Sequence, residues 1–179
     1  MSSLHRAALP ALGAAILFGA STPLAKQIMG DGAVSPFLLA GLLYLGSGVG
    51  LSLLRLVRDR GWKPADLPRA EWPWMCGAIL FGGVLGPLLL MLGLAHTTAA
   101  NASLLLNFEA VLTALLAWCV FRENADRRIV LGMLLIVAGG AVLAWSGRGA
   151  AALGLGLGPL ALLGACLAWA IDNIAKLNF

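Results

Sequence analysis

An acidic side chain in the middle of an apolar stretch is the clearest candidate for chemistry in this sequence. Glu109 lies near the centre of residues 99–121, which are otherwise mostly apolar. A charge at the centre of a membrane helix costs roughly 2.5–3.5 kcal/mol on insertion scales, so we expect Glu109 to face the protein interior. There it can bind a cationic substrate group or carry a proton; the alternative is a structural carboxyl bonded to a neighbouring Asn. Asn107 is about 200° around the helix from it, so the polar lining is only partial.

Two other ionisable side chains, Lys26 and Asp172, also fall inside apolar stretches. Both lie near the ends of these stretches, so the alternative to a binding role is that they reach the membrane interface. Ser21 and Thr22 precede Lys26, and Asn173 follows Asp172. If these two polar groups occupy matching places in a repeat, they can meet at the interface between repeats, where substrate sites of inverted-repeat transporters lie. All seven side chains are candidates for binding a substrate or a proton.

Other kinds of site find little support. His5 and His96 have no acid or cysteine at metal-ligand spacing, and the three cysteines lie in apolar stretches, where we interpret them as small apolar residues. No phosphate-binding glycine loop or nucleophile motif is present, so we predict no metal and no cofactor. A membrane-embedded enzyme, one alternative, would need a catalytic cluster near an interface.

The composition identifies the elements that must hold these side chains. Of the 179 residues, 60% are hydrophobic and 11% are charged, whereas about a quarter are charged in soluble domains. Membrane-spanning helices need about 20 apolar residues each, and the charged residues occur in clusters separated by stretches of that length. We therefore predict an all-α integral membrane protein with about six spans. They are expected at 8–29, 35–56, 72–95, 99–121, 129–146 and 153–176.

The basic residues indicate an orientation. Ten Lys and Arg residues fall on one side of the predicted spans and two, Lys26 and Arg148, on the other. Cytoplasmic loops carry the excess of basic residues, so the amino terminus is predicted in the cytoplasm. The net charge of +4 is explained by these loops, and no nucleic-acid partner is predicted.

The sixth span resembles the first. Leu12-Gly13-Ala14 aligns with Leu163-Gly164-Ala165, and the same offset pairs Ser21-Thr22 with Asp172-Asn173. The first copy contains five helices, an odd number, so a second copy that starts at the sixth span begins on the opposite side of the membrane. This arrangement is an inverted repeat, as in many secondary transporters.

Glycine and proline mark predicted packing faces and helix irregularities. Three glycine pairs have the four-residue spacing that lets membrane helices approach closely: Gly46 with Gly50, Gly82 with Gly86, and Gly154 with Gly158. Prolines 23, 87 and 159 lie within spans or at their edges. A proline in a span can kink the helix or expose carbonyl groups beside a cavity.

Four stretches in order resemble the EamA-like family of the drug/metabolite transporter superfamily. They are LGAAILFGASTPLAK (12–26), FLLAGLLYLGSGVGLSLLRL (37–56), NASLLLNFEAVLTALLAWCVFRE (101–123) and GMLLIVAGGAVLAW (132–145). The resemblance implies two five-helix repeats in inverted orientation and export of small metabolites or drugs across a bacterial inner membrane. We therefore expect residues 1–146 to form the first repeat and 147–179 to begin the second, so that the chain resembles a member truncated after the sixth helix.

A single complete repeat has consequences for function. Alternating access needs one repeat to move against the other, so we expect the chain alone not to transport an unidentified small-molecule substrate. The sixth helix is expected to expose Asp172 and Asn173 to lipid or to an open groove. The chain would then be unstable, or it would pair with a second copy or with a complementary half in the lipid bilayer. The remaining alternative is a non-transporting membrane subunit that pairs with another chain.

Overall fold

The computed structural model describes residues 2–30, 34–59, 61, 67–121, 126–145 and 156–176, and these residues form helices without any strand. In chain order the elements are α1 (Ser2–Met29), α2 (Pro36–Arg58), the 3₁₀ helix η1 (Arg69–Glu71), α3 (Trp72–Ala78), the π-helix η2 (Ile79–Leu85), α4 (Gly86–Ala95), α5 (Ala99–Leu105), α6 (Phe108–Phe121), α7 (Arg127–Trp145) and α8 (Leu157–Lys176). The predicted all-α class is confirmed.

Several of these elements join end to end, so the described residues make six long helical segments at the six predicted places. Four of the segments are long and apolar enough to cross a membrane: Pro36–Arg58, Arg69–Ala95, Ala99–Phe121 and Leu157–Lys176. The other two are α1 and α7, with 28 and 19 residues. The predicted boundary between repeats, at residues 146 and 147, lies outside the described residues.

Local sequence signals set where two of the helices begin. The Ser35 side chain accepts a hydrogen bond from the Leu38 N–H ahead of α2, and Pro36 occupies the first turn. The Thr98 side chain does the same for α5, accepting from the Asn101 N–H. Both satisfy a donor that the first turn of a helix leaves without a backbone partner.

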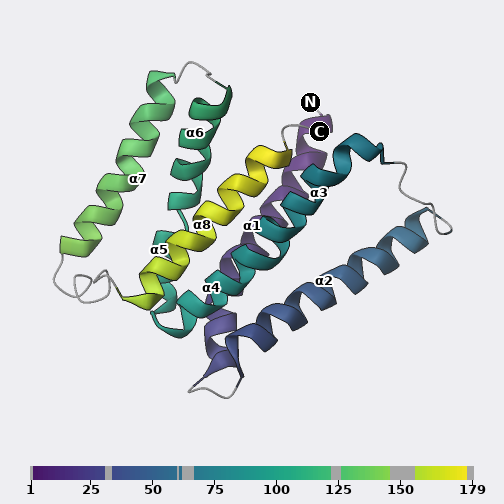
Figure 1. The fold of residues 1–179 in the computed structure, drawn as a ribbon, viewed down its shortest axis with the longest axis horizontal. Helices are drawn as coiled ribbons and strands as arrows, with labels where there is room; N and C mark the ends of the chain where they lie inside the picture. Colours follow the sequence, from purple (N-terminus) through teal and green to yellow (C-terminus); the bar gives the residue numbers. More distant parts are fainter. Residues whose placement is uncertain are drawn as a thin grey trace.

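Successive segments run in opposite directions, and α8 lies in the middle of the assembly (Figure 1). α1 begins and α8 ends at the same end of the structure, so these two helices run antiparallel. This direction agrees with an inverted second repeat, which stays a prediction. α2 and α7 lie at the two outer sides in this view.

Of the four segments that are long and apolar enough to cross a membrane, the last one, α8, is the most buried. α8 packs against α3, η2 and α4 on one side and against α6 on the other. Half of its span is buried, whereas the other three spans are between 11% and 28% buried. The expectation that this helix would expose its polar residues is wrong for Asp172, which is 5% exposed.

Small residues allow this close packing. A Cβ added to Gly93 of α4 would meet the Leu162 side chain and would lie 2.9 Å from the Gly158 carbonyl oxygen of α8. Gly82 and Gly86 also face α8, as their spacing predicts. No described residue lies within 4 Å of the Cβ position of Gly46 or Gly50, so packing of this pair stays a prediction. Gly154, the remaining member of the predicted pairs, is outside the described residues.

Candidate functional site

The third span contains a break in its hydrogen-bond ladder that faces α8. η2 is a π-helix, in which the Gly86 N–H donates to the Phe81 carbonyl, five residues earlier. In the same register, Gly82 would pair with residue 87, but this residue is proline and has no N–H. The carbonyl group of Gly82 therefore lacks a partner within its own helix. Pro87 thus exposes a carbonyl, as a proline within a span can do.

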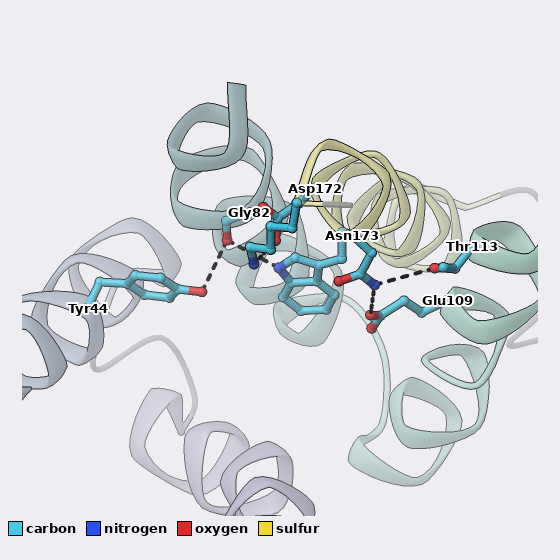
Figure 2. A network of polar contacts seen from close by, with 8 residues as sticks. Tyr44, Gly82, Glu109, Thr113, Asp172 and Asn173 are labelled. Carbon is cyan, nitrogen blue, oxygen red and sulfur yellow. Dashed lines mark hydrogen bonds and ion pairs between the residues drawn. The ribbon is translucent and has the colours of Figure 1, made fainter. Parts of the chain in front are cut away.

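Two aromatic side chains from other helices supply the missing donors. Trp169 of α8 donates from its indole Nε1 to the Gly82 carbonyl oxygen at 3.2 Å. Tyr44 of α2 donates from its hydroxyl to the same oxygen at 3.3 Å. Figure 2 shows the Tyr44 side chain directed at Gly82. The bond from Trp169 is partly buried and the bond from Tyr44 is exposed, and together they connect η2 to α8 and α2.

The Asp172 carboxyl group lies against the same glycine. A Cβ on Gly82 would overlap this carboxyl group, so the close approach requires glycine at position 82. The Lys176 ammonium group, one turn later on α8, binds Asp172 Oδ2 at 2.6 Å. Asp172 Oδ1 is buried and has no hydrogen-bond partner among the described residues. One half of this carboxyl group is thus satisfied and the other is not.

On the side of α8 that faces α6, a second polar group forms around Asn173. Its side-chain amide donates to Glu109 Oε1 at 3.2 Å and to Thr113 Oγ1 at 3.4 Å. Figure 2 shows Glu109 and Thr113 directed at Asn173, away from Gly82 and Tyr44. Glu109 lies in the first turn of α6, where the helix dipole favours a negative charge. This contact with α8 agrees with the expectation that Glu109 faces the protein interior.

A cavity of about 960 Å³ opens between α2, the third span and α8. Its size is at the upper end of the range usual for small-molecule sites. The lining is mostly apolar and includes the polar side chains Tyr44, Glu71, Asp172 and Lys176. Its full set of lining residues is Tyr44, Leu67, Glu71, Met75, Ala78, Ile79, Gly82, Gly83, Trp169, Asp172 and Lys176.

The remaining predicted residues lie elsewhere. Lys26 donates from its ammonium group to the carbonyl oxygens of Leu94 and Ala95, at 2.6 and 3.2 Å, and so caps the end of α4. Ser21 donates to a carbonyl oxygen of its own helix, and Thr22 is buried. α1 packs against α2, α4 and α5, which places these three residues outside the polar groups around Asp172 and Asn173.

Asn107 has a local role in the fourth span. The span breaks at residues 106 and 107, between α5 and α6. The Asn107 amide donates to the carbonyl oxygens of Ser103 and Leu104, at 3.1 and 3.2 Å, near the end of α5. Its side chain thus adds a donor at the break, where the Leu104 carbonyl oxygen also accepts from the backbone N–H of Asn107.

Sequence reasoning missed several members of this site. Lys176 could have been found, because a base four residues after an acid pairs with it on a helix. Tyr44 and Trp169 gave no such signal, because their role depends on the π-helical register of residues 79–85. Thr113 could have been noted as one helical turn after Glu109. Among the described residues, no group of three His, Cys, Asp or Glu side chains could hold a metal ion.

Known proteins resemble this chain over most of its length. An uncharacterized transporter from Methanothermobacter thermautotrophicus is 28% identical over 177 residues, which cover 90% of this chain and 50% of that protein. The uncharacterized transporter YyaM of Bacillus subtilis is 29% identical, over 72% of this chain and 41% of its own length. The chain thus spans about half the length of these transporters or less.

A shorter relative matches more closely over a smaller part. The probable 4-amino-4-deoxy-L-arabinose-phosphoundecaprenol flippase subunit ArnE of Pseudomonas paraeruginosa is 42% identical over 111 residues, 59% of this chain and 92% of that subunit. No solved structure matches the chain. The family model described as the EamA-like transporter family matches residues 5–145. The chain therefore belongs to the EamA-like transporter family of the drug/metabolite transporter superfamily.

Proposed function

We propose that this chain forms one side of a pathway that exports a small metabolite through a bacterial inner membrane. The observation that carries the proposal is that ionisable and polar side chains meet at α8, which is surrounded by apolar helices. Asp172 borders a cavity, and Asn173 binds Glu109. Ionisable residues inside a membrane protein commonly mark substrate or ion pathways. The transporter names of the relatives favour a non-enzymatic role over a membrane-embedded enzyme.

We further propose that a complementary half completes the pathway. Inverted-repeat transporters bind substrate between two repeats, and the second repeat begins here with α8. The chain covers half of one transporter relative, and the ArnE relative is named as a subunit. This half supplies the matching helices, either from a second copy of this chain or from another segment of polypeptide. Unlike the exposed sixth helix expected from the sequence, α8 already has its neighbours within this chain.

A second candidate function is transfer of a lipid-linked amino sugar. The identity to the ArnE flippase subunits, 42–45%, exceeds the 28–29% identity to the longer transporters. The substrate in the ArnE name carries an amino group and a polyprenyl phosphate. Uptake of a water-soluble metabolite supports the first candidate, and movement of only a lipid-linked sugar supports the second.

Uptake into inside-out membrane vesicles tests the transport proposal. Vesicles from cells that express the chain should accumulate at least one member of a panel of radiolabelled amines, amino acids, carboxylates and sugars. We expect Glu109→Gln to lower this uptake at least tenfold, because it removes the charge next to Asn173. Asp126→Asn, at an exposed position before α7, should leave uptake unchanged.

Each other outcome has a definite meaning. Equal uptake by the wild type and Glu109→Gln removes Glu109 from the pathway. No uptake of any soluble or lipid-linked substrate overturns transport and favours a non-transporting subunit. We expect the purified chain alone to give no flux in liposomes. Flux from the purified chain would show that copies of it complete the pathway.

The proposed orientation places the amino terminus in the cytoplasm, and cysteine labelling in intact cells tests it. Cys76 and Cys119 are exposed, so a background without native cysteines is needed. A cysteine at position 96 is expected to react with an impermeant thiol reagent, because His96 lies between α4 and α5 on the predicted outer side. A cysteine at position 126, before α7, is expected to react only after the cells are permeabilised. The reverse pattern would contradict the orientation.

A further inference from the structure

The cavity beside α8 carries an excess of negative charge. Among the described lining residues, Asp172 and Glu71 are acidic and Lys176 is basic. From this charge and its mostly apolar walls, we propose that the cavity binds the ammonium group of an organic amine with an apolar body. The inference rests on the proposed function in one respect: the bound amine is taken to be the cargo.

Asp172 is the group that binds the amine. It is 5% exposed, and only one of its carboxylate oxygens, Oδ2, has a partner in the structure. Oδ1 is buried and has no hydrogen-bond partner among the described residues, although an unpaired buried polar atom costs free energy. A ligand ammonium group has three N–H donors, so it can bind Oδ2 and also satisfy Oδ1. The structure therefore contains a buried acceptor in need of a donor at the wall of a cavity.

Lys176 occupies the position that the ligand would take. Its ammonium group lies 2.6 Å from Asp172 Oδ2, while its side chain is 58% exposed. The Lys176 side chain is long, flexible and 58% exposed on the last turn of α8, so it can move into water once a ligand ammonium group takes over the pairing of the Asp172 carboxylate. The lysine thus keeps the carboxylate paired when the cavity is empty. An incoming amine displaces it, so Lys176 acts as an internal competitor.

The other polar groups at the cavity favour a cation over an anion. The indole N–H of Trp169 and the hydroxyl of Tyr44 already donate to the Gly82 carbonyl oxygen. Lys176 already binds Asp172. An anion would have to displace these donors beside two acidic side chains. An amine meets a carboxylate, and its apolar part meets aromatic and aliphatic walls, as in most ligand pockets.

Equilibrium dialysis of radiolabelled benzylamine against the purified chain in lipid nanodiscs tests the site. Benzyl alcohol, of similar shape but neutral, is the matched probe. Wild-type protein should bind benzylamine at least tenfold more tightly than benzyl alcohol. Asp172→Asn should weaken benzylamine binding at least tenfold and leave benzyl alcohol binding unchanged. Asp126→Asn, far from the cavity lining, should change neither affinity.

The dialysis measurement on the Lys176→Gln variant decides between a cation site and an anion site. It should tighten benzylamine binding several-fold, because the competing ammonium group is gone and Asp172 stays in place. Weaker binding in Lys176→Gln, or undiminished binding in a folded Asp172→Asn, would overturn the proposal. If Asp172→Asn does not fold, Lys176→Gln and the benzyl alcohol comparison still decide. Benzylamine binding without vesicle uptake of any substrate would support the amine site and contradict the transport proposal. Vesicle uptake without benzylamine binding would support transport and contradict the amine site.

Discussion

Gly93→Val is expected to lower the free energy of unfolding of this protein by up to about 3 kcal/mol. The Cβ of the new side chain would lie within about 3 Å of the Leu162 side chain and the Gly158 carbonyl oxygen. The oxygen belongs to the backbone of α8 and cannot move aside without moving the helix. α4 and α8 would separate, and the fully buried Leu94 and Leu162 between them would lose contacts. The measurement is unfolding by sodium dodecyl sulfate titration in mixed micelles, followed by circular dichroism.

Gly46→Val is the matched control for this prediction. Gly46 is also inside a membrane helix, α2, but no described part of the chain lies within 4 Å of its Cβ position. The control therefore reports the change in helix propensity without a packing clash, and this change amounts to a few tenths of a kcal/mol in favour of valine. Equal stability of the two variants would contradict the tight contact between α4 and α8.

The same pair of glycines shows how much of the fold the sequence predicts. Apolar length alone predicts the six helical segments, because the need to cross a hydrocarbon layer fixes the length of each apolar stretch. Spacing alone does not tell which glycines pack. Gly46 and Gly50 have the same spacing as Gly82 and Gly86, but within the described part of the chain only the second pair faces another helix. The rotation of each helix about its axis depends on contacts between segments far apart in the chain.

Some residues of the candidate site can also be predicted from the sequence, and others cannot. Glu109 and Asp172 stand out in the sequence because charged residues are rare inside membrane helices. Their partners do not stand out. The contact between Asn173 and Glu109 depends on α8 packing against α6, and the role of Gly82 depends on a π-helical turn ahead of Pro87. The offset that relates Ser21 and Thr22 to the polar residues of α8 suggested a common site. The structure instead packs their helix, α1, against α2, α4 and α5.

Trp169→Ala is expected to have the largest effect on stability, a loss of about 3 kcal/mol in the free energy of unfolding; this is the lower end for a core tryptophan, because the ring is partly buried and lines the cavity. The indole ring lies directly over Gly86, where even a Cβ would overlap it. Its removal opens a void between α8 and the third span and takes away one donor to the Gly82 carbonyl oxygen. The same detergent titration measures the loss. Trp72→Ala is the control, because Trp72 is 50% exposed at the start of α3 and should cost far less.

Trp169→Phe separates the two contributions of this side chain. Phenylalanine keeps most of the packing against Gly86 and loses only the indole N–H. Tyr44 continues to donate to the Gly82 carbonyl oxygen, so that oxygen is not left unpaired, and the expected loss is about 1 kcal/mol or less. A loss as large as that of Trp169→Ala would contradict this account. It would mean that the Tyr44 hydroxyl cannot hold the exposed carbonyl without the indole, and that the π-helical turn depends on Trp169.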